Sequence, residues 1–175
     1  ASMTFTARPG AVTADGTAAV LHYGGLFPEQ RALASGGVVA RGDLGVLALA
    51  GADRMRWLDS LTSQHLVGLA PHQSTETLIL DPHGHIEHAF HIVDDGETTW
   101  AVTASSHLAA ALEWLTKMRF RADVQIWDAS DDVFVLAQYG DLSTDLAAHG
   151  WPVWDDPWPG VSAGGFGYAD RVIDW

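Results

Sequence analysis

Four histidines fall within nine residues near the middle of the chain, and histidine is the commonest metal ligand in proteins. They are His83, His85, His88 and His91. Side chains of a strand alternate between its two faces, so in a strand His85 and His91 share a face with Glu87. His88 then lies on the opposite face. His85 and His91 are about 20 Å apart along an extended strand, so they cannot share one ion and we expect no metal here.

A basic trio, Lys117, Arg119 and Arg121, carries a third of the nine Lys and Arg side chains of the chain. The alternation in Arg119-Phe120-Arg121 predicts a strand in which both guanidinium groups face the same way. Two interpretations stay open. The arginines either pair with the surplus carboxylates of the chain or bind the carboxylates of a ligand, for which a guanidinium fork is well shaped.

Signatures of covalent catalysis are missing from the sequence. No Gly-x-Ser-x-Gly nucleophile elbow occurs, and the glycine-rich residues 164–167 are not followed by the Lys-Ser/Thr of a phosphate loop. The chain contains no cysteine. Its absence excludes disulfides, thiolate catalysis and cysteine-ligated zinc or iron–sulfur clusters within these residues.

The eight tryptophans could serve either packing or a binding surface. Three lie on apolar faces and are expected in the core: Trp57, Trp100 and Trp114. Three more stand among prolines in a predicted surface loop over residues 151–167: Trp151, Trp154 and Trp158. An aromatic ring beside a cleft can stack on a flat heterocycle, but packing is the default interpretation of both groups.

The composition predicts a folded, soluble, cytoplasmic protein. Of its 175 residues 47% are hydrophobic and 18% charged, which is enough apolar material for a core. No apolar run approaches the roughly 20 residues that cross a bilayer, and the first residues do not show the basic-then-apolar pattern of a signal segment. The net charge of −13 disfavours nucleic acid and anionic membranes as partners.

Residues 27–65 are predicted to form short strands and helices. A helix is expected at 27–35, and the glycine-punctuated apolar residues 38–50 predict two strands with a turn near Gly42. A second helix should begin near Asp53, whose carboxylate suits the helix dipole, and continue through His65, because apolar residues recur there at helical spacing.

The remainder predicts hairpins interleaved with helices. Further strands are expected at 75–80, 85–93, 98–103, 122–127 and 133–138. The residues that join the first two, 81–84, carry a proline and a glycine that favour a tight turn. Ser105 or Ser106 should cap a helix ending near Lys117, and Gly150 should close a short helix at 142–149. The fold class is therefore α+β with a largely antiparallel sheet and packed helices.

Four segments, in order, resemble the YgfZ-type and T-protein-type folate-binding proteins, and the match runs over about residues 36–140. Residues 45–66 resemble the family's strand and turn followed by "F-L-Q-x-Q-x-T-x-D", and residues 77–87 resemble its hairpin "N/D-x-x-G-x-I/V". Residues 100–115 resemble the family's next strand and its amphipathic helix. Residues 118–126 resemble the strand "R-Y-x-L-R-x-K-V-x-I". The resemblance implies a T-protein-like fold that binds tetrahydrofolate.

One departure from the pattern concerns catalysis. T-proteins that transfer an aminomethyl group carry "G-G-x-I-D-D" in the hairpin, and one of the aspartates works beside the folate nitrogen. Here His88 and Ala89 replace both aspartates, and Glu87 is expected on the other face. The loss of a placed carboxylate argues against catalysis and favours the YgfZ branch, which is linked to iron–sulfur cluster assembly or repair.

The resemblance implies a set of folate-binding residues: Gln64, Gly84, Glu87, His88, Arg119 and Arg121. The first four would surround the pterin, and the arginines would hold its glutamate end. Iron–sulfur proteins are the implied partners. Two rival functions are a folate-dependent aminomethyltransferase-like enzyme and a non-catalytic module that recruits proteins through the tryptophan-rich loop.

The expected domain organisation follows the same resemblance. Residues 1–35 form a lead-in segment, 36–125 the first lobe and 126–175 the start of an incomplete second lobe. The YgfZ hallmark "K-G-C-Y-x-G-Q-E" does not occur. The chain is therefore expected to be a truncated piece of a longer protein.

Overall fold

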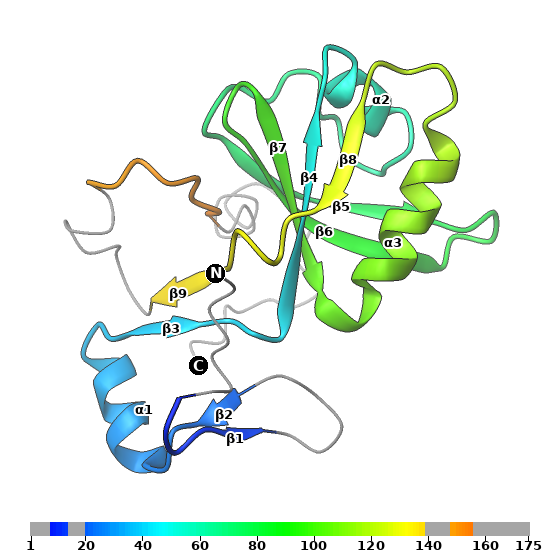
Figure 1. Ribbon diagram of the computed structural model, residues 1–175. Coiled ribbons are helices and arrows are strands. Elements are labelled where there is room, and N and C mark those ends of the chain that lie inside the picture. The colour runs from blue at the N-terminus through cyan, green and yellow to red at the C-terminus, as the bar shows by residue number, and fades with distance from the viewer. Residues whose placement is uncertain (1–7, 14–19, 139–147, 156–175) are drawn as a thin grey trace, which may run out of the picture.

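The computed structural model describes residues 8–13, 20–138 and 148–155 (Figure 1). The strands are β1 (Val12–Thr13), β2 (Val20–His22), β3 (Val38–Ala40), β4 (Leu44–Ala50), β5 (Ser74–Leu80), β6 (Ile86–Asp94), β7 (Thr98–Ala104), β8 (Gln125–Asp128) and β9 (Leu136–Gln138). The helices are α1 (Leu26–Ala34), α2 (Arg54–Asp59) and α3 (Ser105–Met118).

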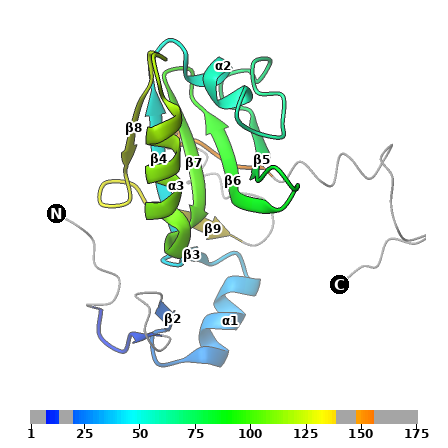
Figure 2. The same ribbon diagram turned by 90° about the vertical axis from the view of Figure 1, so that its right-hand side faces the viewer.

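A five-stranded antiparallel sheet in the order β5-β6-β7-β4-β8 forms the body of the molecule. Helix α3 crosses one face of this sheet and packs on β4, β7 and β8 (Figure 2). Two smaller sheets, β1-β2 and β3-β9, lie beside it. The predicted α+β class with a largely antiparallel sheet is confirmed.

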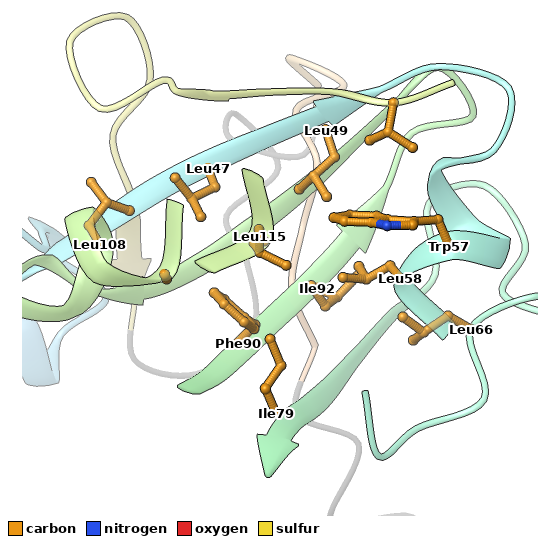
Figure 3. Close-up of a cluster of buried hydrophobic side chains, with 13 residues drawn as sticks. Leu47, Leu49, Trp57, Leu58, Leu66, Ile79, Phe90, Ile92, Leu108 and Leu115 are labelled. Carbon is orange, nitrogen blue, oxygen red and sulfur yellow. The ribbon is translucent and has the colours of Figure 1, made fainter. Parts of the chain in front are cut away.

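The main core lies between this sheet and the two helices α2 and α3 (Figure 3). Residues 44–50 are apolar without alternation because they form β4, a central strand that is covered on both faces. Leu47 and Leu49 point toward the helices, and both are fully buried. Val46 and Ala48 point to the second face, where they form a smaller cluster with Ala129.

The second face of the sheet is partly covered by residues 151–155. The Trp154 indole stacks edge-on against the His91 ring with centroids 4.4 Å apart, and its Nε1 donates to the Thr75 carbonyl at 3.1 Å. The Ser74 hydroxyl both donates to the Asp155 carbonyl and accepts from the Asp155 amide, each at 2.9 Å. The first residues of the predicted surface loop, 151–155, therefore run along β5.

Most predicted elements are confirmed, with boundaries shifted by a few residues at β8 and β9. The β1-β2 hairpin inside the lead-in segment is an element that the sequence did not predict. Strand β8 begins at the predicted lobe boundary and pairs with β4, so the sheet extends to residue 128. The helix predicted at 142–149 falls largely outside the described residues, as do Trp158 and the glycines at 164–167.

Two predictions about helix ends are wrong. Helix α2 ends at Asp59 and does not reach His65, because the Asp59 carboxylate accepts hydrogen bonds from the Leu66 and Val67 amides at 2.6 and 3.2 Å and fixes a loop there. Helix α3 has no side-chain cap, since its N-cap position is Ala104 and the predicted capping serines lie inside the first turn.

The Arg119-Phe120-Arg121 segment is a turn and not the predicted strand. Arg119 caps α3 in helical conformation, and Phe120 then takes a positive φ of 44°. A positive φ reverses the chain direction after a helix, as a glycine usually does. The chain re-enters the sheet only at Gln125.

Candidate functional site

The tip of the β5-β6 hairpin is organised by Asp81, not by a strand that includes His85. The Asp81 Oδ1 accepts from the His83 and His85 amides at 2.8 Å each, and its Oδ2 lies 2.9 Å from the His85 Nδ1. Hydrogen bonds from His85 hold the pKa of the Asp81 carboxyl below its usual value. Strand β6 starts one residue later than predicted, so His85 belongs to the turn.

A β-bulge at Glu87 changes which side chains share a face. Ile79 pairs with His88, whereas Leu80 pairs with Ile86, which leaves Glu87 as an extra residue on β6. In a bulge two residues oppose one on the partner strand, and strict alternation is lost. Glu87 and His88 therefore line the same hollow, and the prediction that they lie on opposite faces is wrong.

This hollow, here called the β6–α3 hollow, has a volume of about 380 Å³. Six residues line it: Glu87, His88, Ala110, Glu113, Trp114 and Lys117. The four from α3 recur at helical spacing, so they form one stripe along the helix. The stripe faces the start of β6, which contributes Glu87 and His88. A volume of this size lies at the lower end of small-molecule sites.

His88 is the buried polar group of this hollow, with 9% of its surface exposed. Its Nδ1 is fully buried and has no hydrogen-bond partner among the described residues. The ring packs edge-on against Trp114 at 6.3 Å and is tilted against Phe90 at 6.2 Å. Burial lowers the pKa of His88; the nearby Glu87 opposes this shift and His107 adds to it. His88 is therefore a neutral imidazole at neutral pH.

The rim of the hollow carries both signs of charge. Lys117 Nζ lies 2.5 Å from Glu113 Oε1, and this pairing holds the pKa of the Glu113 carboxyl below its usual value. Glu87 is exposed and forms no ion pair with any described residue. Its carboxylate is therefore available to a ligand, beside an indole wall and a neutral imidazole.

The structure brings together only two of the six residues predicted to bind folate, Glu87 and His88. Gly84 lies at the hairpin tip with φ of 87° and open space around it. Gln64 lies in the loop after α2, which runs along β5 where Ser63 exchanges hydrogen bonds with Leu78. That loop does not line the hollow.

The two arginines of the predicted set are exposed at the C-terminal end of α3. Neither Arg119 nor Arg121 forms an ion pair with a described residue. They lie next in the chain to Lys117, which does line the hollow.

Sequence reasoning missed the contribution of α3. Trp114 was expected in the core, yet it is half-buried and forms a wall, while Trp57 is buried as predicted and Trp100 is half-buried. The sequence did contain a signal for this wall, because polar residues at 113 and 117 interrupt the apolar face of the helix next to Trp114. The sequence alone could not show that β6 faces this stripe.

Two further findings concern metal binding and membrane-spanning helices. Within residues 8–13, 20–138 and 148–155, no three His, Asp or Glu side chains converge in a way that could hold a metal ion. None of the helices in these same ranges combines the length and apolar character that a bilayer span needs.

Comparison with known proteins identifies a similar fold but no related sequence. No protein-family model matches the chain, and no curated protein sequence does. Among solved structures the chain is similar to glycine cleavage system aminomethyltransferase T from Bartonella henselae, with a TM-score of 0.56 and 18% identity. The match covers 67% of this chain and 33% of that one. About two thirds of this chain therefore share the fold of about one third of that protein.

Proposed function

We propose that this chain belongs to a tetrahydrofolate-binding accessory protein of the YgfZ type and that the pterin occupies the β6–α3 hollow. The observation that carries the proposal is the T-protein fold combined with a changed hairpin. By the sequence resemblance, His88 and Ala89 stand where the T-protein pattern has its two aspartates, and His88 lines the hollow. The fold argues for the ligand, and the replacement argues against the transfer reaction.

The chemistry of the hollow suits a pterin. The ring of a pterin is flat and presents an amino group and a ring N–H on one edge, which together can donate two hydrogen bonds to one carboxylate. Glu87 offers an unpaired carboxylate, and the half-buried Trp114 offers an aromatic wall for stacking. The neutral His88 can donate or accept one further hydrogen bond.

The same chemistry disfavours aminomethyl transfer. When a folate amine attacks a methylene carbon, positive charge develops on its nitrogen, and a nearby carboxylate stabilises that charge. A histidine side chain is neutral or positively charged, so His88 cannot supply the negative charge of an aspartate. Ala89 supplies no polar group at all.

Iron–sulfur proteins are the proposed partners, and this part of the proposal rests on the YgfZ resemblance. The 175 residues contain no cysteine, so thiolate ligands for a cluster would come from outside this stretch. The net charge of −13 argues against nucleic acid and anionic membranes as partners.

A folate-dependent aminomethyltransferase is the second candidate, because the similar solved structure is such an enzyme. Of the two carboxylates that line the hollow, Glu113 pairs with Lys117, which leaves Glu87 as the one that could replace the missing aspartates. Turnover of an aminomethyl donor that is lost in Glu87→Gln would favour this candidate over the accessory role. Absence of turnover with intact folate binding would favour the accessory role.

Calorimetric titration with tetrahydrofolate tests the binding step. We expect saturable binding that weakens about tenfold in Trp114→Ala, since one aromatic stack contributes about 1 kcal/mol or more. Trp151→Ala is the matched control, because Trp151 is exposed and lies outside the hollow. Glu87→Gln should weaken binding as well, with Glu97→Gln as its control.

Two outcomes would overturn the placement. Binding unaffected by Trp114→Ala and Glu87→Gln would put the pterin elsewhere. No binding of any reduced folate would remove the folate proposal and leave a non-catalytic interaction module as the better account.

A further inference from the structure

We propose that the turn formed by Arg119, Phe120 and Arg121, here called the RFR turn, is a docking site for an acidic linear segment of a partner protein. This inference goes beyond the proposed function, because none of the three residues lines the β6–α3 hollow. The docked segment would present an apolar side chain between carboxylates, which repeats the Arg-Phe-Arg order of the turn with opposite charge.

Phe120 holds a backbone conformation that a bulky side chain rarely adopts. Its φ is 44°, and the one other described residue with a positive φ that is not glycine is His72. Histidine is enriched in that conformation, whereas a bulky residue there is an outlier. The Phe120 side chain is 83% exposed, the highest value among the exposed large hydrophobic residues of the described chain. Burial therefore does not offset the strain, and strain of this kind persists at functional sites.

The RFR turn is held in place on both sides. The Trp57 indole Nε1 donates to the Met118 carbonyl at 3.0 Å, just before the turn. Just after it, the Asp53 amide donates to the Asp123 carbonyl at 3.2 Å, and the Asp123 amide donates to the Asp53 carboxylate at 3.0 Å. Figure 1 shows the segment between α3 and β8 at the end of the sheet where α2 lies. A surface that is already ordered loses little conformational entropy when a partner binds.

The RFR turn is a basic stretch in an acidic chain. No acidic residue lies between Glu113 and Asp123. The three cations of this stretch are Lys117, Arg119 and Arg121. Lys117 pairs with Glu113, but neither arginine forms an ion pair with a described residue. Because the whole chain carries a net charge of −13, an acidic segment is repelled from most of its surface and is favoured at the RFR turn.

An exposed aromatic ring between two arginines suits protein recognition. Arginine and aromatic residues are enriched at protein–protein interfaces, where a few such side chains carry most of the binding free energy. Each guanidinium group can bind a carboxylate, and the exposed ring of Phe120 can pack against an apolar side chain. Phe27 and Arg31 of α1 are also exposed but have no positive φ, so they provide the matched control.

The test is an NMR titration with a capped peptide of the sequence Glu-Asp-Phe-Glu-Asp-Leu-Glu, followed through the tryptophan indole N–H signals. Trp57 is the reporter of the RFR turn, because its indole donates to the Met118 carbonyl immediately before the turn. We expect the Trp57 signal to shift in a saturable way, while the signals of Trp114 in the hollow and of Trp100 stay in place. Added salt should weaken the binding, because it screens exposed ion pairs.

Variants of the peptide and of the protein separate the two parts of the contact. A peptide with Gln and Asn in place of Glu and Asp should bind about tenfold more weakly, because each exposed ion pair contributes up to about fivefold. The double variant Arg119→Gln, Arg121→Gln should show the same loss with the original peptide. Phe120→Ala should weaken binding about fivefold through the lost ring contact. The controls Phe27→Ala and Arg31→Gln should keep the full affinity.

Four results would overturn this inference. They are no saturable shift of the Trp57 signal, equal affinity for the acidic and the amide peptide, a shift of the Trp114 signal in its place, and an equal loss of affinity in Phe27→Ala and Phe120→Ala. Displacement of the peptide by tetrahydrofolate would assign the arginines to the folate and would also overturn it. If tetrahydrofolate fails to bind while the peptide binds as expected, the proposed function is overturned and this inference stands.

Discussion

His88 is buried without a hydrogen bond for its Nδ1, and a buried unpaired polar atom is expensive to maintain. The neighbouring rings of Trp114 and Phe90 keep water away from it. This cost gives His88 no advantage as a packing residue, and its place in the lining of the hollow is consistent with a role in ligand binding.

The lowered pKa of His88 predicts how stability depends on pH. As the pH falls through about 6.5, the unfolded chain takes up a proton on this histidine, while the folded protein does not until a lower pH. The unfolding free energy therefore decreases over that window and levels off below the folded pKa. Urea titrations at about pH 8 and about pH 5.5 should show a smaller decrease in His88→Gln than in the unaltered protein. An equal decrease in both would contradict the assignment.

Gly51 and Gly84 both have positive φ, but their surroundings differ. A Cβ at Gly51 would lie 2.2 Å from the Asp123 carbonyl oxygen, whereas one at Gly84 would meet nothing within 4 Å. Gly51→Ala should therefore lower the unfolding free energy by about 3 kcal/mol or more, from strain and overpacking together. Gly84→Ala should cost about 1 to 2 kcal/mol from strain alone. Similar urea midpoints for the two variants would show that the close approach at Gly51 is wrong.

The secondary-structure elements show which features of the fold can be predicted from sequence patterns. The strands β4 to β7 and the helix α3 were predictable because their apolar residues recur at the periods that a sheet and a helix require. The turn at Gly84 was predictable from its proline and glycine. The end of α2 was not, because it depends on the Asp59 carboxylate reaching the Leu66 amide across the loop.

The site was less predictable than the elements, for a physical reason. Strict alternation placed Glu87 opposite His88, and a single extra residue in β6 reverses that conclusion. Bulges depend on the pairing register with β5, which a single sequence does not display. The wall formed by Trp114 depends likewise on how α3 packs against the sheet.

The turn after α3 stores strain that a glycine would release. Phe120→Gly should raise the unfolding free energy by about 0.5 to 1 kcal/mol, because glycine adopts positive φ without a steric cost and little burial is lost. Phe120→Ala keeps the strain and should give no gain. The measurement is the urea midpoint of the three proteins. A loss of stability in Phe120→Gly would mean that the side chain packs in a way that its exposure does not show.

At the scale of the molecule, the chain has the fold of part of a T-protein, and its described surface offers one hollow in which sequence-predicted site residues meet. The five-stranded sheet sets the start of β6 against α3, and the proposed pterin would lie between them.

The most direct test of the folate site is an NMR titration of the tryptophan indole N–H signals with tetrahydrofolate. Trp100 is the internal control, because its indole donates to the Asp95 carboxylate away from the hollow. The account predicts that the Trp114 signal, assigned by Trp114→Phe, shifts in a saturable way while the Trp100 signal stays in place. A titration that leaves Trp114 unmoved, whether or not other signals shift, would contradict a pterin site between β6 and α3.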